Sequence, residues 1–409
     1  MSGEPAGAPG RGRFTELPDL AVRTIGGSVA DASDELFAER ENLIKRAAPA
    51  FAPGTFGPKG QVYDGWETRR RREPGHDHAV VRLGAAGVIR GVVVDTSFFT
   101  GNYPPEISVE AAGVEGYPSP AELGRSSWAT IVPRSPVKGD TRNAFEVADG
   151  HRYTHVRLSI YPDGGVARLR VHGEVVPDPR YLAGTVDLAA AENGGLVTGC
   201  SDMFYSSAAN LIQPGRPATM GDGWETARRR DGGHDWVTVR LAVPGRLRHA
   251  ELDTSCFVGN APGWARLSAT PDLGTAGPGA GGPGGPGAAG PGADGPGAGA
   301  GPWPELLPRT RLQPDTRHRF LFGGEALAAA VRLDVYPDGG MARLRLWGEA
   351  DPASLRAAAA RWLDVLPATQ AASVLETAGL PRQRAAEVAA AGAGRWDRLP
   401  APVRASLAP

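Results

Sequence analysis

Cysteine is scarce in this chain, which has only Cys200 and Cys256 among its 409 residues. Their spacing fits no metal-binding Cys-x-x-Cys pair, and two cysteines cannot build the disulfide framework typical of small secreted domains. Long apolar runs are missing too, since no stretch approaches the ~20 residues of a membrane-spanning helix. The opening MSGEPAGAPGRGRF has no apolar core behind its basic residues, unlike a secretory signal. We therefore expect free thiols and a cytoplasmic protein.

An excess of one charge is also absent. The chain has 44 Lys and Arg residues against 45 Asp and Glu residues, a formal net charge of −1. Nucleic-acid-binding and polybasic membrane-binding proteins have a large positive field instead, so we expect neither partner. A phosphate-cradling Gly-rich loop is not found, and Ser97 and Ser255 lack the flanking glycines of a nucleophile elbow. These absences argue against nucleotide binding and against acyl-enzyme chemistry.

What the chain does contain is one dense polar segment that occurs twice. Gln61–Arg82, QVYDGWETRRRREPGHDHAVVR, returns at Asp222–Arg240 as DGWETARRRDGGHDWVTVR. Other segments repeat in the same order: GGSVADASDELFAERENLI (26–44) as GGLVTGCSDMFYSSAANLI (194–212), DTSFFTGN (95–102) as DTSCFVGN (253–260), and VRLSIYPDGGVARLRVHGE (156–174) as VRLDVYPDGGMARLRLWGE (331–349). The period is far too long for a solenoid, so we predict a tandem duplication of one whole domain.

Composition sets the expected domain boundaries. Residues 1–18 are rich in Gly and Pro and are predicted to form a disordered leader. The two repeats are placed at 19–185 and 186–352. The Gly/Pro/Ala-rich stretch 271–302 is predicted to be a flexible surface loop within the second repeat. Residues 353–409 have Ala, Leu and Arg at helical spacing, and a helical C-terminal appendage is expected there.

The pattern inside each repeat is typical of strands. Short β-branched or alternating runs are separated by turn residues such as Pro162-Asp163-Gly164-Gly165. One short helix per repeat is expected before Asn42 and Asn210. Many short strands with long polar loops indicate a mainly β fold made of two antiparallel sandwiches or jelly rolls. The runs in the first repeat are Ala79–Leu83, Val88–Val94, Glu106–Ala111, Val156–Tyr161 and Val166–Val171.

The duplicated polar segment brings carboxylates and guanidinium groups together. A guanidinium fork binds a carboxylate or a urea-type carbonyl through paired donors, which suits a small ligand with many hydrogen bonds. The alternative is a charge run that covers a solvated surface. His76 beside Asp77 could shuttle protons near neutral pH. The same histidine could ligate a metal with Asp95, or could only end a loop. The residues by themselves leave these alternatives open.

These motifs resemble those of the allantoicase (allantoate amidinohydrolase) family of purine catabolism. The resemblance lies in DLAVRTIGGSVADASDELFAERENLI, GQVYDGWETRRRR, GHD, VDTSFFTGNYPP and YPDGG-ARLRVHGE, with their second-repeat copies, and covers residues 19–350. It implies two jelly-roll domains of the galactose-binding-like type. It also implies a hydrolase of C–N bonds in linear amidines, which converts allantoate to ureidoglycolate and urea, and a homo-oligomer.

The resemblance and the residue chemistry together nominate a site. The catalytic candidates are His76, Asp77, Glu67 and Asp64. The substrate-binding candidates are Arg69, Arg70, Arg71, Arg72, Asp95, Thr96, Asn102, Arg134 and Asn42. Their second-repeat equivalents are Asp222, Glu225, Arg228, His234, Asp235, Asp253, Asn260 and Arg309. Because Arg69 becomes Ala227, the first repeat is the stronger candidate, and a site between the repeats is the alternative.

Two other functions compete with this hypothesis. One is a non-enzymatic jelly-roll protein that binds a carbohydrate or another small ligand. The other is a metal-dependent hydrolase of a different ureide. No cofactor is evident in the sequence, and a requirement for a divalent metal stays open.

Overall fold

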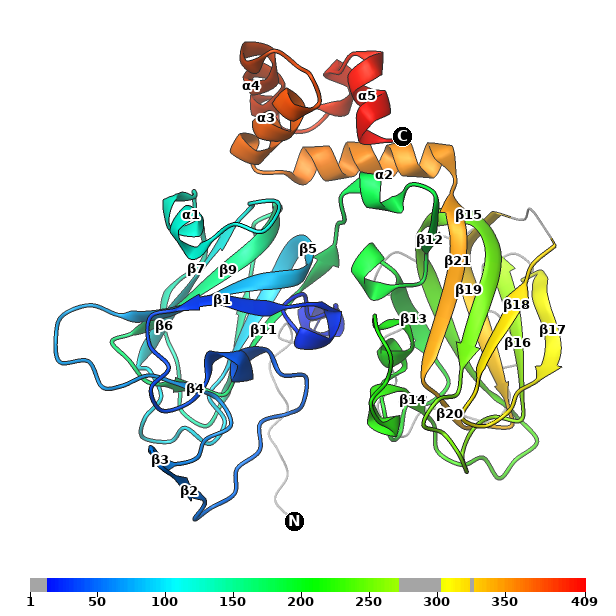
Figure 1. Ribbon diagram of the computed structural model, residues 1–409, viewed down its shortest axis with the longest axis horizontal. Coiled ribbons are helices and arrows are strands. Elements are labelled where there is room, and N and C mark those ends of the chain that lie inside the picture. Colours follow the sequence, from blue (N-terminus) through cyan, green and yellow to red (C-terminus); the bar gives the residue numbers. More distant parts are fainter. Residues whose placement is uncertain (1–12, 272–302, 324–326) are drawn as a thin grey trace. The chain divides into compact units, whose positions relative to one another are not determined.

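The computed structural model describes residues 13–271, 303–323 and 327–409 (Figure 1). Most of the predicted leader and nearly all of the predicted loop, at 1–12 and 272–302, lie outside the described residues. The chain divides by its contacts into two units, Met1–Val176 with Trp362–Val403, and Pro177–Arg361 with Arg404–Pro409. Each unit contains one repeat and is mainly β.

Strand β5 (Asp77–Asp95) is the centre of the first unit. Its first half pairs with β1 and β9, and its second half pairs with β8 and β11, all antiparallel. Strand β9 also pairs with β6, and β6 pairs with β7. The strands are β1 (Ser28–Ala32), β6 (Glu106–Ala112), β7 (Ala129–Pro136), β8 (Arg142–Glu146), β9 (Arg152–Tyr161) and β11 (Arg168–Val175), with the short β2 (Phe56–Gly57), β3 (Gly60–Gln61), β4 (Trp66–Glu67) and β10 (Gly165–Val166).

The two runs predicted as separate strands at 79–83 and 88–94 form this single strand. Its pairing with β9 shifts register between Arg82 and Gly87. The intervening Gly84, Ala85, Ala86 and Gly87 have the composition of a turn, which explains why the sequence pattern suggested a break. The irregularity lies where the strand changes from β9 as its partner to β11 and β8, so its two halves pair with different strands.

The second unit repeats this arrangement around β15 (Asp235–Asp253) (Figure 1). Strand β15 pairs with β13, β18, β19 and β21. Strand β19 also pairs with β16, and β16 pairs with β17. Both units therefore confirm the predicted fold class. The strands are β12 (Thr185–Asp187), β13 (Leu196–Cys200), β14 (Trp224–Glu225), β16 (Trp264–Thr270), β17 (Glu305–Arg311), β18 (Arg317–Leu321), β19 (Leu327–Tyr336), β20 (Gly340–Met341) and β21 (Arg343–Ala350).

Helices are short within the repeats. The segments next to Asn42 and Asn210 form the 3-10 helices η3 (Arg40–Ile44) and η6 (Ala208–Ile212), and the first repeat also has α1 (Pro120–Arg125). Further single turns are η1 (Arg13–Glu16), η2 (Arg23–Ile25), η4 (Pro179–Leu182), η5 (Ala191–Asn193) and η7 (Met220–Asp222). The end of the predicted leader is ordered, because Phe14 of η1 is buried.

The C-terminal segment is helical, with α2 (Pro352–Val365), α3 (Ala368–Thr377), α4 (Arg382–Ala390), η8 (Trp396–Arg398) and α5 (Ala401–Leu407). Arg395 is buried and donates to the carbonyls of Leu363, Leu366 and Ala389, so it satisfies helix-end acceptors that water cannot reach. Gln370 donates to Glu115 of the first repeat. None of the described helices combines the length and hydropathy needed to cross a membrane.

The Gly-Trp turn of the duplicated segment is fixed by packing. Trp66 and Trp224 are fully buried, and their indole N–H groups donate to the backbone carbonyls of Asp34 and Asp202. A Cβ at Gly65 would come within 2.7 Å of the Phe99 ring. Only glycine therefore lets the backbone pass this ring, and the buried Thr68 that follows donates its backbone N–H to the carbonyl of Gly164.

Candidate active site

The arginine-rich loop, residues 68–76, lies between β4 and β5. Arg71 and Asp77 form its best-buried ion pair. Arg71 Nη1 donates to Asp77 Oδ1 at 2.8 Å, and the Ser33 hydroxyl donates to the same oxygen. The backbone N–H of Arg71 donates to Asp163 in the turn between β9 and β10. Asp77 is buried, and within the described residues its second oxygen accepts no hydrogen bond. An unsatisfied buried carboxylate oxygen is rare in native proteins, and the matching oxygen of Asp235 in the second repeat is unsatisfied too, so both repeats share this feature.

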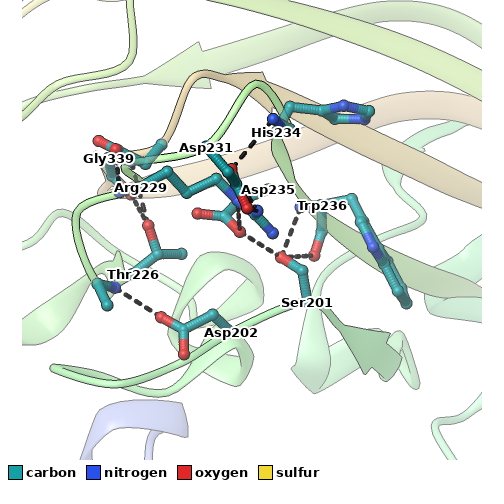
Figure 2. Close-up of polar contacts among 12 residues, drawn as sticks. Ser201, Asp202, Thr226, Arg229, Asp231, His234, Asp235, Trp236 and Gly339 are labelled. Atoms are coloured by element: carbon teal, nitrogen blue, oxygen red, sulfur yellow. Dashed lines mark hydrogen bonds and ion pairs between the residues drawn. The ribbon is translucent and has the colours of Figure 1, made fainter. Parts of the chain in front are cut away.

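The second repeat rebuilds the same pair (Figure 2). Arg229 Nε donates to Asp235 Oδ1 at 2.9 Å, and the Ser201 hydroxyl donates to that oxygen as well. Arg229 also pairs with Asp231. Figure 2 shows the ring of His234 turned away from the Asp235 carboxylate. The sequence-based set named Arg228 for this repeat, but Arg228 is exposed and Arg229 makes the contact.

Asp34 binds Arg69, the first residue of the arginine run. Its carboxylate accepts from the backbone N–H groups of Leu36 and Arg69 and from the Arg69 guanidinium at 2.7 Å. Burial raises the pKa of Asp34, but these hydrogen bonds outweigh it and leave that pKa below its usual value. Asp202 makes the matching backbone contact with Ala227. The exchange of Arg69 for alanine therefore removes the guanidinium and keeps the loop geometry.

Glu67 and Asn102 form a hydrogen bond that each repeat contains in its own copy. Asn102 Nδ2 donates to Glu67 Oε1 at 2.7 Å, and Asn260 donates to Glu225 in the same way. Burial raises the pKa of Glu67, opposed by the Asn102 hydrogen bond. Glu67 is thereby better suited to hold a proton near neutral pH than an exposed glutamate.

His76 and Arg134 both contact the ring of Tyr161. The rings of His76 and Tyr161 have centroids 4.9 Å apart, and Arg134 Cζ lies 4.3 Å from the centre of the Tyr161 ring. Arg134 also pairs with Glu106, and the Tyr161 hydroxyl lies 2.9 Å from Ser108 Oγ. His76 and Arg134 are exposed, so a protonatable ring and a guanidinium lie on one aromatic support at the surface.

The second repeat keeps this trio and adds a carboxylate. His234 stacks on Tyr336 with centroids 4.5 Å apart, and Arg309 Cζ lies 4.3 Å from that ring. His234 Nε2 also lies 3.0 Å from Oδ1 of the buried Asp334. The pairing of the strands places Ser159 at the matching point of the first repeat, because Ser159 faces His78 as Asp334 faces Trp236.

The remaining predicted residues serve contacts within loops. Asp64 pairs with the buried Arg168 and with Lys45, and Asn42 donates to the carbonyl of Gly65. Asp95 accepts from Ser97, and Thr96 is buried and donates to backbone carbonyls of the 138–141 loop. Arg70 and Arg72 are exposed. In the second repeat, Asp222 accepts from backbone N–H groups at 218 and 219, and Asp253 accepts from Ser255.

Metal ligation by these residues was one of the alternatives. In the described ranges, no three His, Cys, Asp or Glu side chains are grouped so that they could hold a metal ion. The candidate histidines have aromatic and arginine neighbours, and His234 also has the single carboxylate of Asp334.

Comparison with known proteins decides the family. The family model described as allantoicase repeat matches residues 18–176 and 186–351. The chain belongs to the allantoicase family. It is 57% identical over 340 residues to a probable allantoicase of Nocardia farcinica, with 82% of this chain and 95% of the relative covered. A probable allantoicase of Streptomyces coelicolor is 49% identical over 349 residues, with 82% and 86% covered.

The fold agrees with that of solved allantoicases. A structure of allantoicase is similar with a TM-score of 0.67 at 33% sequence identity, covering 81% of this chain and 93% of that one. A crystal structure of allantoicase from Saccharomyces cerevisiae gives 0.67 at 32%, covering 82% and 95%. The resemblance read from the motifs is thereby confirmed.

In this allantoicase-family chain, sequence reasoning missed four first-repeat residues of the candidate site. They are Ser33, Asp34, Tyr161 and Asp163. Asp34 was visible as a position shared with Asp202, and Tyr161 as the start of a duplicated Tyr-Pro-Asp-Gly-Gly turn. Their duplication was the available signal, but a shared residue in a duplicated turn is as readily explained by structure as by function.

Proposed function

We propose that this protein hydrolyses allantoate to ureidoglycolate and urea. The support is the match of two allantoicase repeats to nearly the whole folded chain, at up to 57% identity to a probable allantoicase. Allantoate has a carboxylate and two ureido groups on one carbon. Its hydrolysis adds water, breaks one C–N bond and requires a proton on the nitrogen that leaves with urea.

The observation that supports the site is the gathering of His76 and Arg134 on Tyr161. A guanidinium can hold the substrate carboxylate through paired donors. A histidine beside it can exchange a proton near neutral pH. We assign carboxylate binding to Arg134, with the exposed Arg70 and Arg72 nearby in sequence, and proton transfer to His76. Arg71, Asp77, Asp34 and Ser33 then act by fixing the loop that ends in His76.

The first repeat is the better candidate for catalysis. In the second repeat, the Nε2 atom of His234 is within hydrogen-bond distance of Asp334. Asp334 also accepts from Arg266 and Arg332. Ser159 stands at the matching position in the first repeat, so the His76 ring is available to a substrate. The guanidinium of Arg69 also exists only in the first repeat.

Urea release tests the proposal. Purified protein is incubated with allantoate, with and without a chelator, and urea and ureidoglycolate are measured. Equal amounts of both products support allantoate hydrolysis, and their loss in the chelated sample would reveal a metal requirement. Release from another ureide alone would favour that substrate, and no release from any ureide would favour the non-enzymatic binding protein.

The proposal has two further parts. A homo-oligomer is expected from the family resemblance, and light scattering of the purified protein tests it, since a monomeric mass would contradict it. A cytoplasmic location is expected from the scarcity of cysteine, and cell fractionation tests that.

A further inference from the structure

A second polar site lies on the sheet of the second unit, and of the predicted site residues only Asp253 lines it. Three neighbouring strands, β18, β15 and β21, place charged side chains in register there. Arg319 faces Glu251, which faces Arg345, and Arg317 faces Asp253, which faces Arg343. Because side chains of alternate residues share a face, these rows lie on one side of the sheet. His249 and Trp347 continue the pattern, with their rings stacked 5.9 Å apart.

These side chains line a cavity of about 490 Å³. A volume in this range is typical of a site for a small molecule. Five arginines and four acids line the cavity. Arg317 already donates to Glu251, and Arg343 and Arg345 donate to backbone carbonyls. Glu251 is saturated by Arg317 and Arg319, and the side chain of Arg319 is 69% exposed. In its contact with Glu251, Arg319 uses Nε, which leaves its terminal nitrogens for other acceptors.

The first repeat shows that the cavity is not a necessary feature of the fold. At the matching positions, Val93 faces Ala144 where Glu251 faces Arg319. Gly91 and His172 replace His249 and Trp347. There the buried Phe14 covers the surface, since a Cβ on Gly91 would meet the Phe14 ring at 2.2 Å. The first repeat keeps the row of Arg142, Asp95 and Arg168, but it has an apolar pair and a covering ring where the second repeat has Glu251, Arg319 and an open surface.

We propose that this cavity binds a small planar carboxylate that also has N–H donors, the chemical class of ureido-carboxylates. The Arg319 guanidinium holds its carboxylate, the acids other than Glu251 accept from its N–H groups, and the stacked His249 and Trp347 rings provide a flat wall for a planar amide-type group. The choice of this ligand class rests on the proposed function. The site itself belongs to the second unit and is separate in sequence from His76, Tyr161 and Arg134.

Ureidoacetate is the probe, because it has one carboxylate and one ureido group and lacks the second ureido group on the carboxyl-bearing carbon. The full chain is labelled with 5-fluorotryptophan, which gives signals for its nine tryptophans. The Trp347 signal is assigned as the one lost in Trp347→His, a change to the residue of the first repeat. We expect ureidoacetate to move the Trp347 signal in a saturable way, and acetate or urea to bind at least about tenfold more weakly.

The decisive variant is the double change Glu251→Val with Arg319→Ala, which copies the pair found in the first repeat. It should raise the Kd of ureidoacetate at Trp347 by about tenfold or more, because charged hydrogen bonds are lost. The matched control is Arg248→Ala, which removes an exposed guanidinium from the other face of β15 and should leave the Kd unchanged. The other tryptophan signals report whether each variant is folded.

An unchanged Kd in the double variant, or equal binding of acetate and ureidoacetate, overturns the inference. Neither result would bear on the proposed function, since urea release from allantoate is measured separately. Conversely, an absence of urea release would remove the proposed function, and binding of ureidoacetate at Trp347 would still stand.

Discussion

His234 is held by Asp334, with Nε2 and Oδ1 3.0 Å apart, and Asp334 is fully buried. In the first repeat, Ser159 stands at the position that matches Asp334, and His76 is exposed. We therefore expect His76→Ala to lower kcat for urea release by about 10²–10⁴-fold, the usual contribution of a general acid–base group. His234→Ala should leave kcat near the wild-type value. It should cost about 1 kcal/mol of stability, because Asp334 loses one hydrogen bond but keeps its two arginines.

Steady-state kinetics and thermal unfolding of the two variants check this asymmetry. Full turnover by His76→Ala would remove His76 from the mechanism. A loss of kcat in His234→Ala as large as that in His76→Ala would place catalysis in both repeats.

Tyr161 links His76 to Arg134 through its ring, whereas its hydroxyl contacts Ser108. Tyr161→Phe keeps the ring, so kcat/KM should stay near the wild-type value. Tyr161→Ala removes the support from both side chains, and a small misplacement of catalytic groups can cost about 10²-fold. Equal kcat/KM values for the two variants would show that the ring does not position the site, and circular dichroism controls for folding.

The contacts at Tyr161 show what the sequence could and could not predict. The strands that end near this residue were visible as alternating runs, and so was the duplication. The pairing was not visible. Glu106 faces Tyr161 across β6 and β9, Glu106 faces Pro136 across β6 and β7, and Asp77 faces Ile160 across β5 and β9. These pairings bring His76, Arg134 and Tyr161 together. Strand order depends on contacts far apart in the chain, which periodicity does not report.

The same limit explains why the cavity in the second unit was not predicted. Glu251 and Arg319 each look like an isolated charge within a strand. Only the register of β15 with β18 shows that they replace the apolar pair of Val93 and Ala144. A comparison of the two repeats position by position marks both residues as different, but it does not show that they are neighbours.

Gly65 gives a test of the packing under the arginine-rich loop. A Cβ there would lie 2.7 Å from the Phe99 ring and 2.8 Å from the Cα of Ala167. Gly65→Ala should therefore destabilise the protein by about 1–3 kcal/mol, the usual cost of overpacking. Gly101→Ala is the matched control, because a Cβ at Gly101 meets nothing within 4 Å. Denaturant unfolding measures both, and equal stabilities would show that the turn can move away from Phe99.

His155 predicts how stability depends on pH. Burial, and secondarily the charge of Arg82, lowers the pKa of His155 to about 4 from a usual value of 6.5. Between these values the unfolded chain binds a proton that the folded chain does not, so stability falls as the pH drops from 6.5 to 4. A difference of one pKa unit corresponds to about 1.4 kcal/mol, so His155 alone should remove up to about 3 kcal/mol by pH 4.

The second repeat has Ala330 at this position, facing Arg240 as His155 faces Arg82. His155→Ala should therefore fold, be less stable than the wild type at pH 7 because a buried side chain is lost, and lose less stability on acidification. Urea unfolding at pH 7, 5.5 and 4.5 measures the difference, and parallel pH curves for the two proteins would show that His155 is not the group that titrates.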